Sequence, residues 1–475
     1  GVSLSWFYTN IGLKKLHSPY YINDLSVRSP RIMAIPEPGS GLLIPVSSGI
    51  VPRDVDRYSI YIGNTKIRNL PYYYNPFAPV NPMFAILGSP GYGKSELLMN
   101  LILRLKMRNP IDPPVIIIDP QGEYKRVLSH LARLGIHGVE LRVGVDSYLN
   151  IFDSPEGVSY QFWVSNVVVP SIREALNIAP GQAARMDSLM KKIIFKVYHH
   201  QKGYKPSDPS TWREVPTLLD VVREIRSEIA EEEQRREQKR SRGRIQSLNS
   251  LYDRLGRWVF GIGTDYFSRA ASIPIAQLLN IPVTVINVKH LEAEARNLVI
   301  LYIFNVLYQL MKTMLPVKNT IRVVFIVDEG WILLKKTRRG ESPLEILIRQ
   351  ARKYGFMVGV ATQKFDDLSE TILSLVGTLF IFNPNDPKVV DYAKKAGVPE
   401  KTAKEILNLE RGWCLVRSLW ATKTNVENPN AAFFVKVDSE ADPGLNIVSP
   451  RTTTPTQFVR LSESMALINE FTISD

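Results

Sequence analysis

A short glycine-rich stretch, GSPGYGKS at residues 88–95, constrains this chain more than any other feature. It fits the pattern GxxxxGKS, in which glycines let the backbone turn tightly so that its N–H groups point at phosphate oxygens. An apolar strand is expected before it at 83–87, and a helix is expected after it at 95–107. The positive end of such a helix favours the same anion. Because this context is present, the stretch predicts a P-loop that binds a nucleoside triphosphate, and the motifs described below indicate ATP with Mg²⁺.

The residues of the loop take separate roles in this prediction. Lys94 is expected to reach the β- and γ-phosphates, and the Ser95 hydroxyl is expected to ligate Mg²⁺. The residues expected to contact the nucleotide are Gly88, Ser89, Pro90, Gly91, Tyr92, Gly93, Lys94, Ser95 and Glu96.

Alternating strand and helix patterns after the loop predict the fold class. Apolar strands are expected at 115–118, 283–288, 322–327, 357–361 and 377–382. Helical runs lie between several of these strands. Strand, helix and strand in succession are typical of a parallel sheet, so we expect an α/β fold.

Changes in composition divide the chain into parts. Residues 1–80 are rich in Tyr, Pro, Ser and β-branched types and predict a small β-rich N-terminal unit with a linker. Residues 81–154 and 258–435 carry the α/β core. Helical periodicity dominates 155–257, which predicts an all-helical insertion, and 436–475 is expected to be a C-terminal tail.

A second motif, VVFIVDE at 323–329, complements the P-loop. A buried strand that ends in two acids is the Walker B arrangement. Asp328 is expected to hold Mg²⁺ through water, and Glu329 is expected to polarise the attacking water. Apolar strands often end in an acid, but beside a P-loop the motif indicates hydrolysis in addition to binding.

The stretch IIIDPQGEY at 116–124 ends the strand that follows the P-loop helix. In a parallel sheet such strand ends converge on the ligand crevice. Asp119 and Glu123 are therefore candidates to face the nucleotide or its metal. The alternative is a turn whose acid caps the next helix.

Two further candidates follow the Walker B strand. Gln363 closes the strand at 357–361 and is a candidate sensor of the γ-phosphate, with an ordinary surface glutamine as the alternative. Arg349, Arg352 and Lys353 form a basic cluster on the preceding helix. One of them is a candidate arginine finger from a neighbouring subunit, and a plain basic helix face is the alternative.

Composition limits the partners and the compartment. A net charge of +13 and a pI near 9.5 indicate a polyanionic partner, either nucleic acid or an anionic membrane face, or else a generally basic surface. The single cysteine, Cys414, allows no internal disulfide and fits a reducing cytoplasm. No run approaches the roughly 18 consecutive apolar residues of a membrane span. We expect a cytoplasmic protein; because the chain begins at Gly1, attachment to the membrane through an upstream segment stays open.

The ordered set ILGSPGYGKS, IIIDPQGEY, YLNIFD, FIVDEGWILL, IRQARKYG and ATQ resembles the HerA–FtsK group of ring-forming, DNA-pumping ATPases. It is most similar to the conjugative, type IV secretion branch and the archaeal CedB-like DNA-import ATPases. IIIDPQGEY is the most discriminating element, because general P-loop proteins lack it. The resemblance implies a RecA-like P-loop NTPase core with an all-α insertion. It also implies a homohexamer with nucleotides between subunits, DNA in the central channel and a membrane channel protein as partner.

The resemblance also assigns residues by position. It implies that Lys94, Ser95, Asp328 and Glu329 are the ATP machinery. Asp119 and Glu123 match the two acids of the family's DxxGEY motif. Gln363 matches its sensor, and Arg352 matches its arginine finger.

Two functions remain open at this point. The first is an ATPase that translocates DNA without sequence specificity at a membrane DNA-transfer machine. The alternative is a P-loop ATPase that powers protein secretion or pilus assembly and binds no DNA. A non-enzymatic scaffold is disfavoured because Lys94 and Glu329 are both present, and a GTPase is disfavoured because residues 287–290 lack the aspartate that reads guanine.

Overall fold

The computed structural model describes residues 32–34, 43–45, 57–66, 69–76, 81–155, 157–234, 242–260, 266–269, 275–313, 315–317, 320–330, 333, 353–363, 373, 376–419 and 430–438. Its main strands are β3 (Ile60–Thr65), β4 (Pro71–Tyr74), β5 (Phe84–Leu87), β6 (Val115–Asp119), β7 (Gly138–Arg142), β8 (Val283–Asn287), β9 (Val323–Val327), β10 (Phe356–Thr362), β11 (Thr378–Phe382), β12 (Trp413–Leu419) and β13 (Asn430–Val437).

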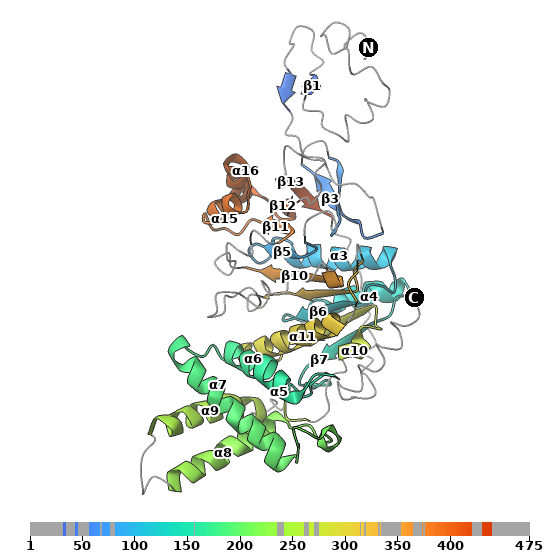
Figure 1. The fold of residues 1–475 in the computed structure, drawn as a ribbon. Helices are drawn as coiled ribbons and strands as arrows, with labels where there is room; N and C mark the ends of the chain where they lie inside the picture. Colours follow the sequence, from blue (N-terminus) through green and yellow to red (C-terminus); the bar gives the residue numbers. More distant parts are fainter. Residues whose placement is uncertain are drawn as a thin grey trace.

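These strands form one 11-stranded sheet in the order β4-β3-β13-β12-β11-β5-β10-β9-β6-β8-β7 (Figure 1). From β11 to β7 all neighbours pair in parallel, and from β11 to β4 all neighbours pair antiparallel. Six of the parallel strands, β5, β6, β8, β9, β10 and β11, are buried along their length, as their mostly apolar sequences require. The expected α/β fold with a parallel sheet is confirmed.

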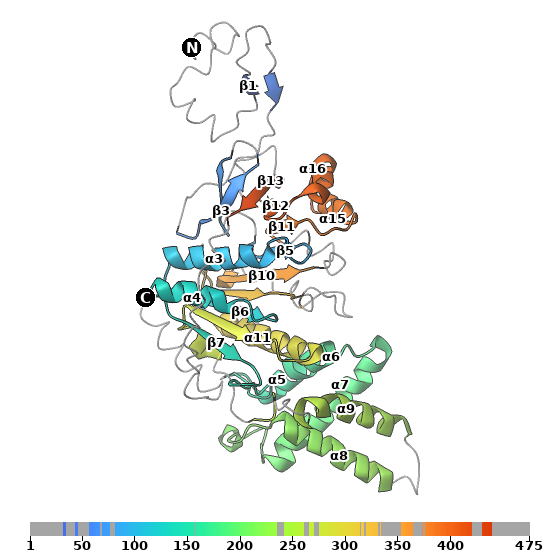
Figure 2. The same ribbon diagram turned by 180° about the vertical axis from the view of Figure 1, so that it is seen from behind.

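Helices cover the sheet and extend beyond it. They are α3 (Lys94–Arg108), α4 (Lys125–Arg133), α5 (Tyr160–Trp163), α6 (Val169–Ala175), α7 (Pro180–Lys196), α8 (Leu218–Gln234), α9 (Arg242–Phe260), α10 (Ile275–Leu278), α11 (Ala293–Thr313), α15 (Val389–Lys395) and α16 (Glu400–Glu405). Figure 2 shows α7, α8 and α9 at the end of the molecule opposite β3 and β13, as does the first view. Among the described residues, no helix has both the length and the apolar character that crossing a membrane demands.

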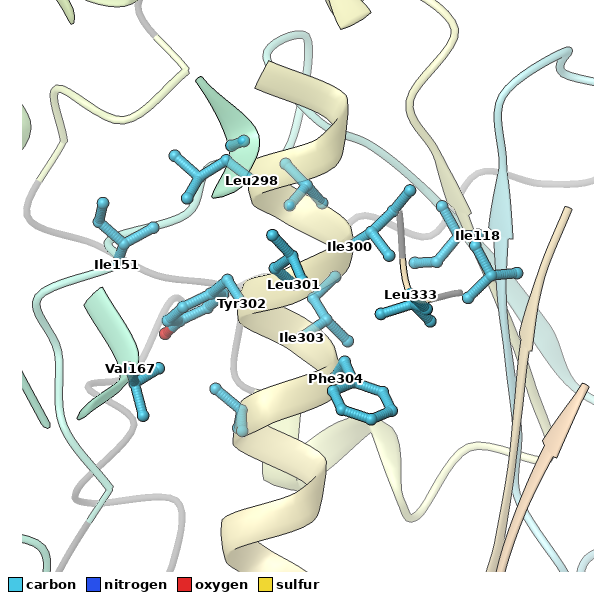
Figure 3. Packing of buried hydrophobic residues seen from close by; sticks show 14 of the residues in the cluster. Ile118, Ile151, Val167, Leu298, Ile300, Leu301, Tyr302, Ile303, Phe304 and Leu333 are labelled. Atoms are coloured by element: carbon cyan, nitrogen blue, oxygen red, sulfur yellow. The ribbon is translucent and has the colours of Figure 1, made fainter. Parts of the chain in front are cut away.

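Alternate residues of each buried strand enter separate cores, because successive side chains of a strand point to opposite faces. In β9, Phe325 packs in the core that contains α11, whereas Val324 and Ile326 pack in the core that contains α3 and α4. Figure 3 shows α11 between two sets of partners. Its residues Ile300 and Phe304 face Ile118 and Leu333, while Tyr302 faces Ile151 and Val167. The helix α11 therefore packs between the sheet and the helices α5 to α9 that follow β7, which are called the helical segment below.

The helical segment carries ion pairs between its own helices and to α11. Lys196 at the end of α7 lies 2.6 Å from Glu224 and 2.8 Å from Glu228 of α8. Arg254 of α9 lies 3.0 Å from Glu294 at the start of α11. These ion pairs link α7 to α8 within the helical segment and link α9 to α11 of the core.

The N-terminal part differs from the expected separate β-rich unit. Strands β3 and β4 lie within residues 1–80, but β3 pairs with β13 and so both belong to the main sheet. A two-stranded sheet of β1 (Ile32–Ala34) and β2 (Leu43–Pro45) is the other described part of this region. At the far end, β13 runs to Val437, past the expected boundary at 435. The main sheet therefore includes two strands from the expected N-terminal unit and ends two residues beyond the expected core.

A glycine in the middle of β10 gives a test of the packing. Gly359 pairs with Phe84 of β5, and a Cβ on Gly359 would lie 2.0 Å from Cζ of the Phe84 ring. Phe84 is fully buried beside Phe380, so it has little room to move. We expect Gly359→Ala to destabilise the protein by about 1–3 kcal/mol through overpacking.

Thermal unfolding measures this effect, with Gly181→Ala as the matched control. Gly181 is exposed near the start of α7, and a Cβ there meets nothing within 4 Å. Because alanine favours a helix over glycine, the control should keep or raise the Tm. Equal Tm values for the two variants would contradict the packing of Phe84 on Gly359.

Candidate functional site

The glycine-rich loop joins β5 to α3 and has the backbone conformation that its glycines allow. Gly88, Gly91 and Gly93 have φ angles of 149°, 78° and 116°. A Cβ on Gly88 would also lie 2.6 Å from Cβ of Phe382 in β11. Both the left-handed backbone and the close approach of β11 therefore require glycine here.

The variable positions of the loop are hydrogen-bonded to two segments that lie far along the chain. Ser89 Oγ donates to the carbonyl of Pro384 at 2.6 Å, and Tyr92 Oη donates to Oδ1 of Asn385 at 3.1 Å. The Tyr92 carbonyl accepts from Gly412 N–H at 3.0 Å. These partners give Ser89 and Tyr92 a structural role that the motif alone does not reveal.

Lys94 is buried at the start of α3, with its ammonium group held over its own loop. Nζ donates to the carbonyls of Gly88 at 2.7 Å and Ser89 at 3.0 Å. Burial lowers the pKa of Lys94, and the nearby Asp328 and Glu329 oppose that shift. A cation is thus fixed at the concave side of the loop, where backbone N–H groups favour an anion.

Asp328 follows β9 and is almost fully buried, at 6% exposed. The pKa of Asp328 is raised to about 6, chiefly by burial. The hydrogen bond from Tyr124 and the charge of Lys94 oppose this rise, whereas the charges of Glu329 and Asp119 add to it. Tyr124 Oη donates to Asp328 Oδ2 at 2.9 Å. Tyr124 is fully buried after the IIIDPQGEY strand, so this motif reaches the first Walker B acid through its last residue.

The surroundings of Asp328 suit a divalent cation. Burial raises the pKa of Tyr124, Asp328 raises it further, and a hydrogen bond with Ser95 lowers it, so both predicted metal ligands border the same hydroxyl. A carboxylate and a hydroxyl are the hard oxygen donors that Mg²⁺ prefers. A buried carboxylate with a raised pKa is also stabilised by a bound cation. The residues present therefore fit Mg²⁺.

Asp119 forms a turn, which is the alternative that its sequence context left open. Its Oδ1 accepts from the backbone N–H groups of Gln121 at 3.1 Å, Gly122 at 2.7 Å and Glu123 at 3.2 Å, and its Oδ2 accepts from Tyr124 N–H at 2.9 Å. Burial raises the pKa of Asp119, while these bonds lower it. With both oxygens engaged, Asp119 holds the turn that carries Gln121 and Tyr124.

Glu123 has an exposed side chain, and its role towards the nucleotide stays a prediction. It lies near Glu96 of α3. Burial raises the pKa of Glu96, Arg126 lowers it, Glu123 raises it and His130 lowers it. The two acids therefore share a mixed charge cluster beside the P-loop helix.

Glu329 receives contacts from several elements. Its Oε1 accepts from Gln121 Nε2 and from Gln363 Nε2, each at 3.1 Å. Its Oε2 lies 3.9 Å from Nη1 of Arg296 in α11. The carboxyl ends of β9 and β10 thus bring the Walker B glutamate and the expected sensor Gln363 together.

Some residues lie outside the sequence prediction or outside the described residues. Arg349 and Arg352 are not among the described residues, and Lys353 is exposed. The prediction missed Gln121, Tyr124 and Arg296 as parts of the site. Gln121 and Tyr124 lie inside the IIIDPQGEY motif, and the place of that motif at a strand end was the signal that could have identified them. The sequence around Arg296 contains no motif that could have identified it.

Comparisons with known proteins agree on the family. Residues 60–307 match the family model for the central domain of helicase HerA, and residues 206–427 match a model for an AAA-like domain. The DNA import protein CedB of Sulfolobus acidocaldarius is 30% identical over 104 residues. That stretch covers 21% of this chain and 17% of CedB, so the match spans less than a fifth of that relative.

Solved structures share the fold. VirB4 of Thermoanaerobacter pseudethanolicus is 18% identical with a TM-score of 0.60, covering 80% of this chain and 97% of that one. The plasmid coupling protein TrwB, in complex with the non-hydrolysable ATP analogue ADPNP, is 15% identical with a TM-score of 0.52, covering 86% and 93%. These likenesses support a RecA-like P-loop core. Because residues 60–307 are more than half of the 475, the chain belongs to the helicase HerA central-domain family, within the HerA–FtsK group of ATPases.

Proposed function

We propose that this protein hydrolyses ATP and uses the energy to translocate DNA. The observation that carries the proposal is the convergence of Lys94, Asp328 and Glu329 at the carboxyl edge of one parallel sheet. Lys94 Nζ donates to the Gly88 carbonyl directly after β5, Asp328 and Glu329 directly follow β9, and these two strands are separated in the sheet by β10 alone. Both acids also oppose the lowering of the Lys94 pKa that burial causes. This is the charge arrangement that phosphoryl transfer to water requires.

Each residue of the site has a proposed role. Lys94 binds the β- and γ-phosphates, together with the backbone N–H groups of residues 88–95. Ser95 and Asp328 would hold Mg²⁺, which when bound neutralises charge on the phosphate oxygens. Glu329 accepts a proton from the attacking water, and Gln363 reports on the γ-phosphate through its bond to Glu329.

DNA as the cargo is supported by the family and by charge. CedB is named as a DNA import protein, and TrwB as a plasmid coupling protein. The net charge of +13 provides an attraction to phosphates that needs no sequence specificity. By the same family argument we propose a ring, hexameric when active, with Arg352 as the finger and a membrane channel protein as partner at the cytoplasmic face.

Hydrolysis and DNA binding test the proposal together. We expect the purified chain to hydrolyse ATP faster when DNA is added, and to bind unrelated DNA sequences equally. Binding should weaken steeply with salt, since each neutralised phosphate makes the slope of log K against log [salt] more negative by about 0.9 for duplex DNA. Particle size should be measured with and without ADPNP and DNA to follow ring assembly.

Two outcomes would overturn parts of this proposal. No hydrolysis in any oligomeric state, with DNA present, would remove the enzymatic assignment. Hydrolysis with no retention of DNA at low salt would favour an ATPase that powers protein secretion or pilus assembly.

A further inference from the structure

Two glutamine side chains from distant parts of the chain meet on one oxygen of Glu329. Gln121 comes from the turn after β6, and Gln363 comes directly after β10, on either side of β9 in the sheet. Both donate to Oε1 at 3.1 Å. Two donors from flanking strands restrict the carboxylate more than either donor alone.

The backbone of Glu329 is fixed as well. Its φ angle is 56°, a left-handed conformation that is uncommon for a residue with a side chain. Glu329 N–H donates to Oδ1 of Asp328 at 3.0 Å, and the next N–H, of Gly330, donates to the Ala361 carbonyl at 3.0 Å. The backbone therefore sets where the side chain starts, and its end is set by the two glutamines.

Gln121 itself starts from a rigid turn. Asp119 accepts its N–H and that of Gly122, as described above, and Gly122 has a φ angle of 77°. A Cβ on Gly122 would lie 3.3 Å from the Lys289 side chain, so the turn is also packed from outside. A long side chain on such a turn can hold its terminal amide in one place.

We propose that Gln121 is a positioning residue for Glu329, and that the IIIDPQGEY turn exists in part to present it. The two glutamines anchor Oε1. Oε2 is then the oxygen that takes the proton from water, as the water oxygen bonds to the γ-phosphorus and the bond to the β–γ bridging oxygen breaks to release ADP. Arg296, 3.9 Å from Oε2, keeps positive charge on that side without a short hydrogen bond. This inference rests on the proposed ATPase activity.

The test compares Gln121→Ala, Gln121→Glu and a matched control, Gln182→Ala, an exposed glutamine on α7. We expect Gln121→Ala to lower kcat about tenfold or more, since small misplacements of a reacting group cost up to about 100-fold. Its Kd for ADPNP and its Tm should stay as in the wild type, because an exposed amide that acts only on Glu329 affects neither. Gln121→Glu should lower kcat further, because a carboxylate cannot donate and repels Glu329.

The outcomes separate this inference from the proposed function. If the wild type hydrolyses ATP and Glu329→Gln does not, the proposed activity stands. A wild-type kcat for Gln121→Ala would then overturn the positioning role. A higher kcat would overturn it too, because it would show that the hydrogen bond from Gln121 holds Glu329 back from the reaction. Equal losses of ADPNP affinity and of kcat would overturn it too, by showing a general structural effect. An inactive wild type would instead refute the proposed function.

Discussion

Replacing Glu329 by Gln is expected to lower kcat for ATP hydrolysis by about 10²–10⁴-fold, the usual contribution of a positioned general base. Glutamine has nearly the same shape, but its amide cannot accept the proton of the attacking water. Lys94, Ser95 and Asp328 stay in place, so the variant should still bind Mg²⁺ and ATP. Single-turnover hydrolysis and the Kd for ADPNP measure the two effects separately.

Glu233→Gln is the matched control, because Glu233 is exposed near the end of α8, in the helical segment. It removes the same charge from the protein and should leave kcat unchanged. If Glu329→Gln keeps more than about a tenth of the wild-type kcat, the assignment of Glu329 as general base would be wrong, since a general base contributes at least about 10²-fold.

The local parts of this site were predictable from the sequence. The P-loop and the Walker B acids each lie within eight or fewer consecutive residues, so strand, turn and helix signals identify them. The parallel sheet was predictable for the same reason, because the strands β5, β6, β8, β9, β10 and β11 are short and mostly apolar. Parallel topology then brings the strand ends together without further information.

Contacts between distant residues were not predictable in this way. Tyr124 and Asp328 are 204 residues apart, and Gln121 and Glu329 are 208 apart. No period or spacing in one sequence reports such a pair. The strands β12 and β13 escaped prediction because they extend the sheet antiparallel beyond the βαβ pattern, and β3 was assigned to a separate unit because its partner β13 lies far along the chain.

Asp119 follows the turn alternative of the sequence prediction, and a direct role towards the nucleotide stays a prediction. The strand end does lie at the site, but the carboxylate accepts four backbone N–H groups of the turn. In a sequence, an acid followed closely by glycine is compatible both with a metal or nucleotide ligand and with a turn. The hydrogen bonds in the structure show the turn. The side chains of this motif that contact Glu329 and Asp328 are those of its neighbours Gln121 and Tyr124.

Replacing Tyr124 by Phe is expected to weaken Mg²⁺-dependent nucleotide binding about twofold at pH 7 and about tenfold below pH 6, because losing a hydrogen bond to a charged group costs about 1.5 kcal/mol, which is about tenfold in proton affinity. Burial already raises the pKa of Asp328 to about 6, and the Tyr124 hydroxyl opposes that shift. Without the donor the pKa of Asp328 rises further. A larger fraction of Asp328 is then protonated at neutral pH, and a protonated carboxyl does not bind Mg²⁺.

The sign of this effect gives it a pH dependence. Because the pKa of the acid is raised, Mg²⁺–nucleotide affinity in the wild type should fall as the pH drops through about 6. In Tyr124→Phe the same fall should begin at higher pH, so the two proteins should differ little at pH 8, about twofold at pH 7 and most below pH 6. Titrations of each protein with ADPNP and Mg²⁺ at several pH values from 8 to below 6 measure the pH at which the affinity falls. The same titrations with EDTA in place of Mg²⁺ should show no difference between the two proteins. Tyr252→Phe, on α9, removes a hydroxyl away from the site and should follow the wild-type curve; a Tyr124→Phe curve that also coincides with the wild type would show that this hydrogen bond does not govern the ionisation of Asp328.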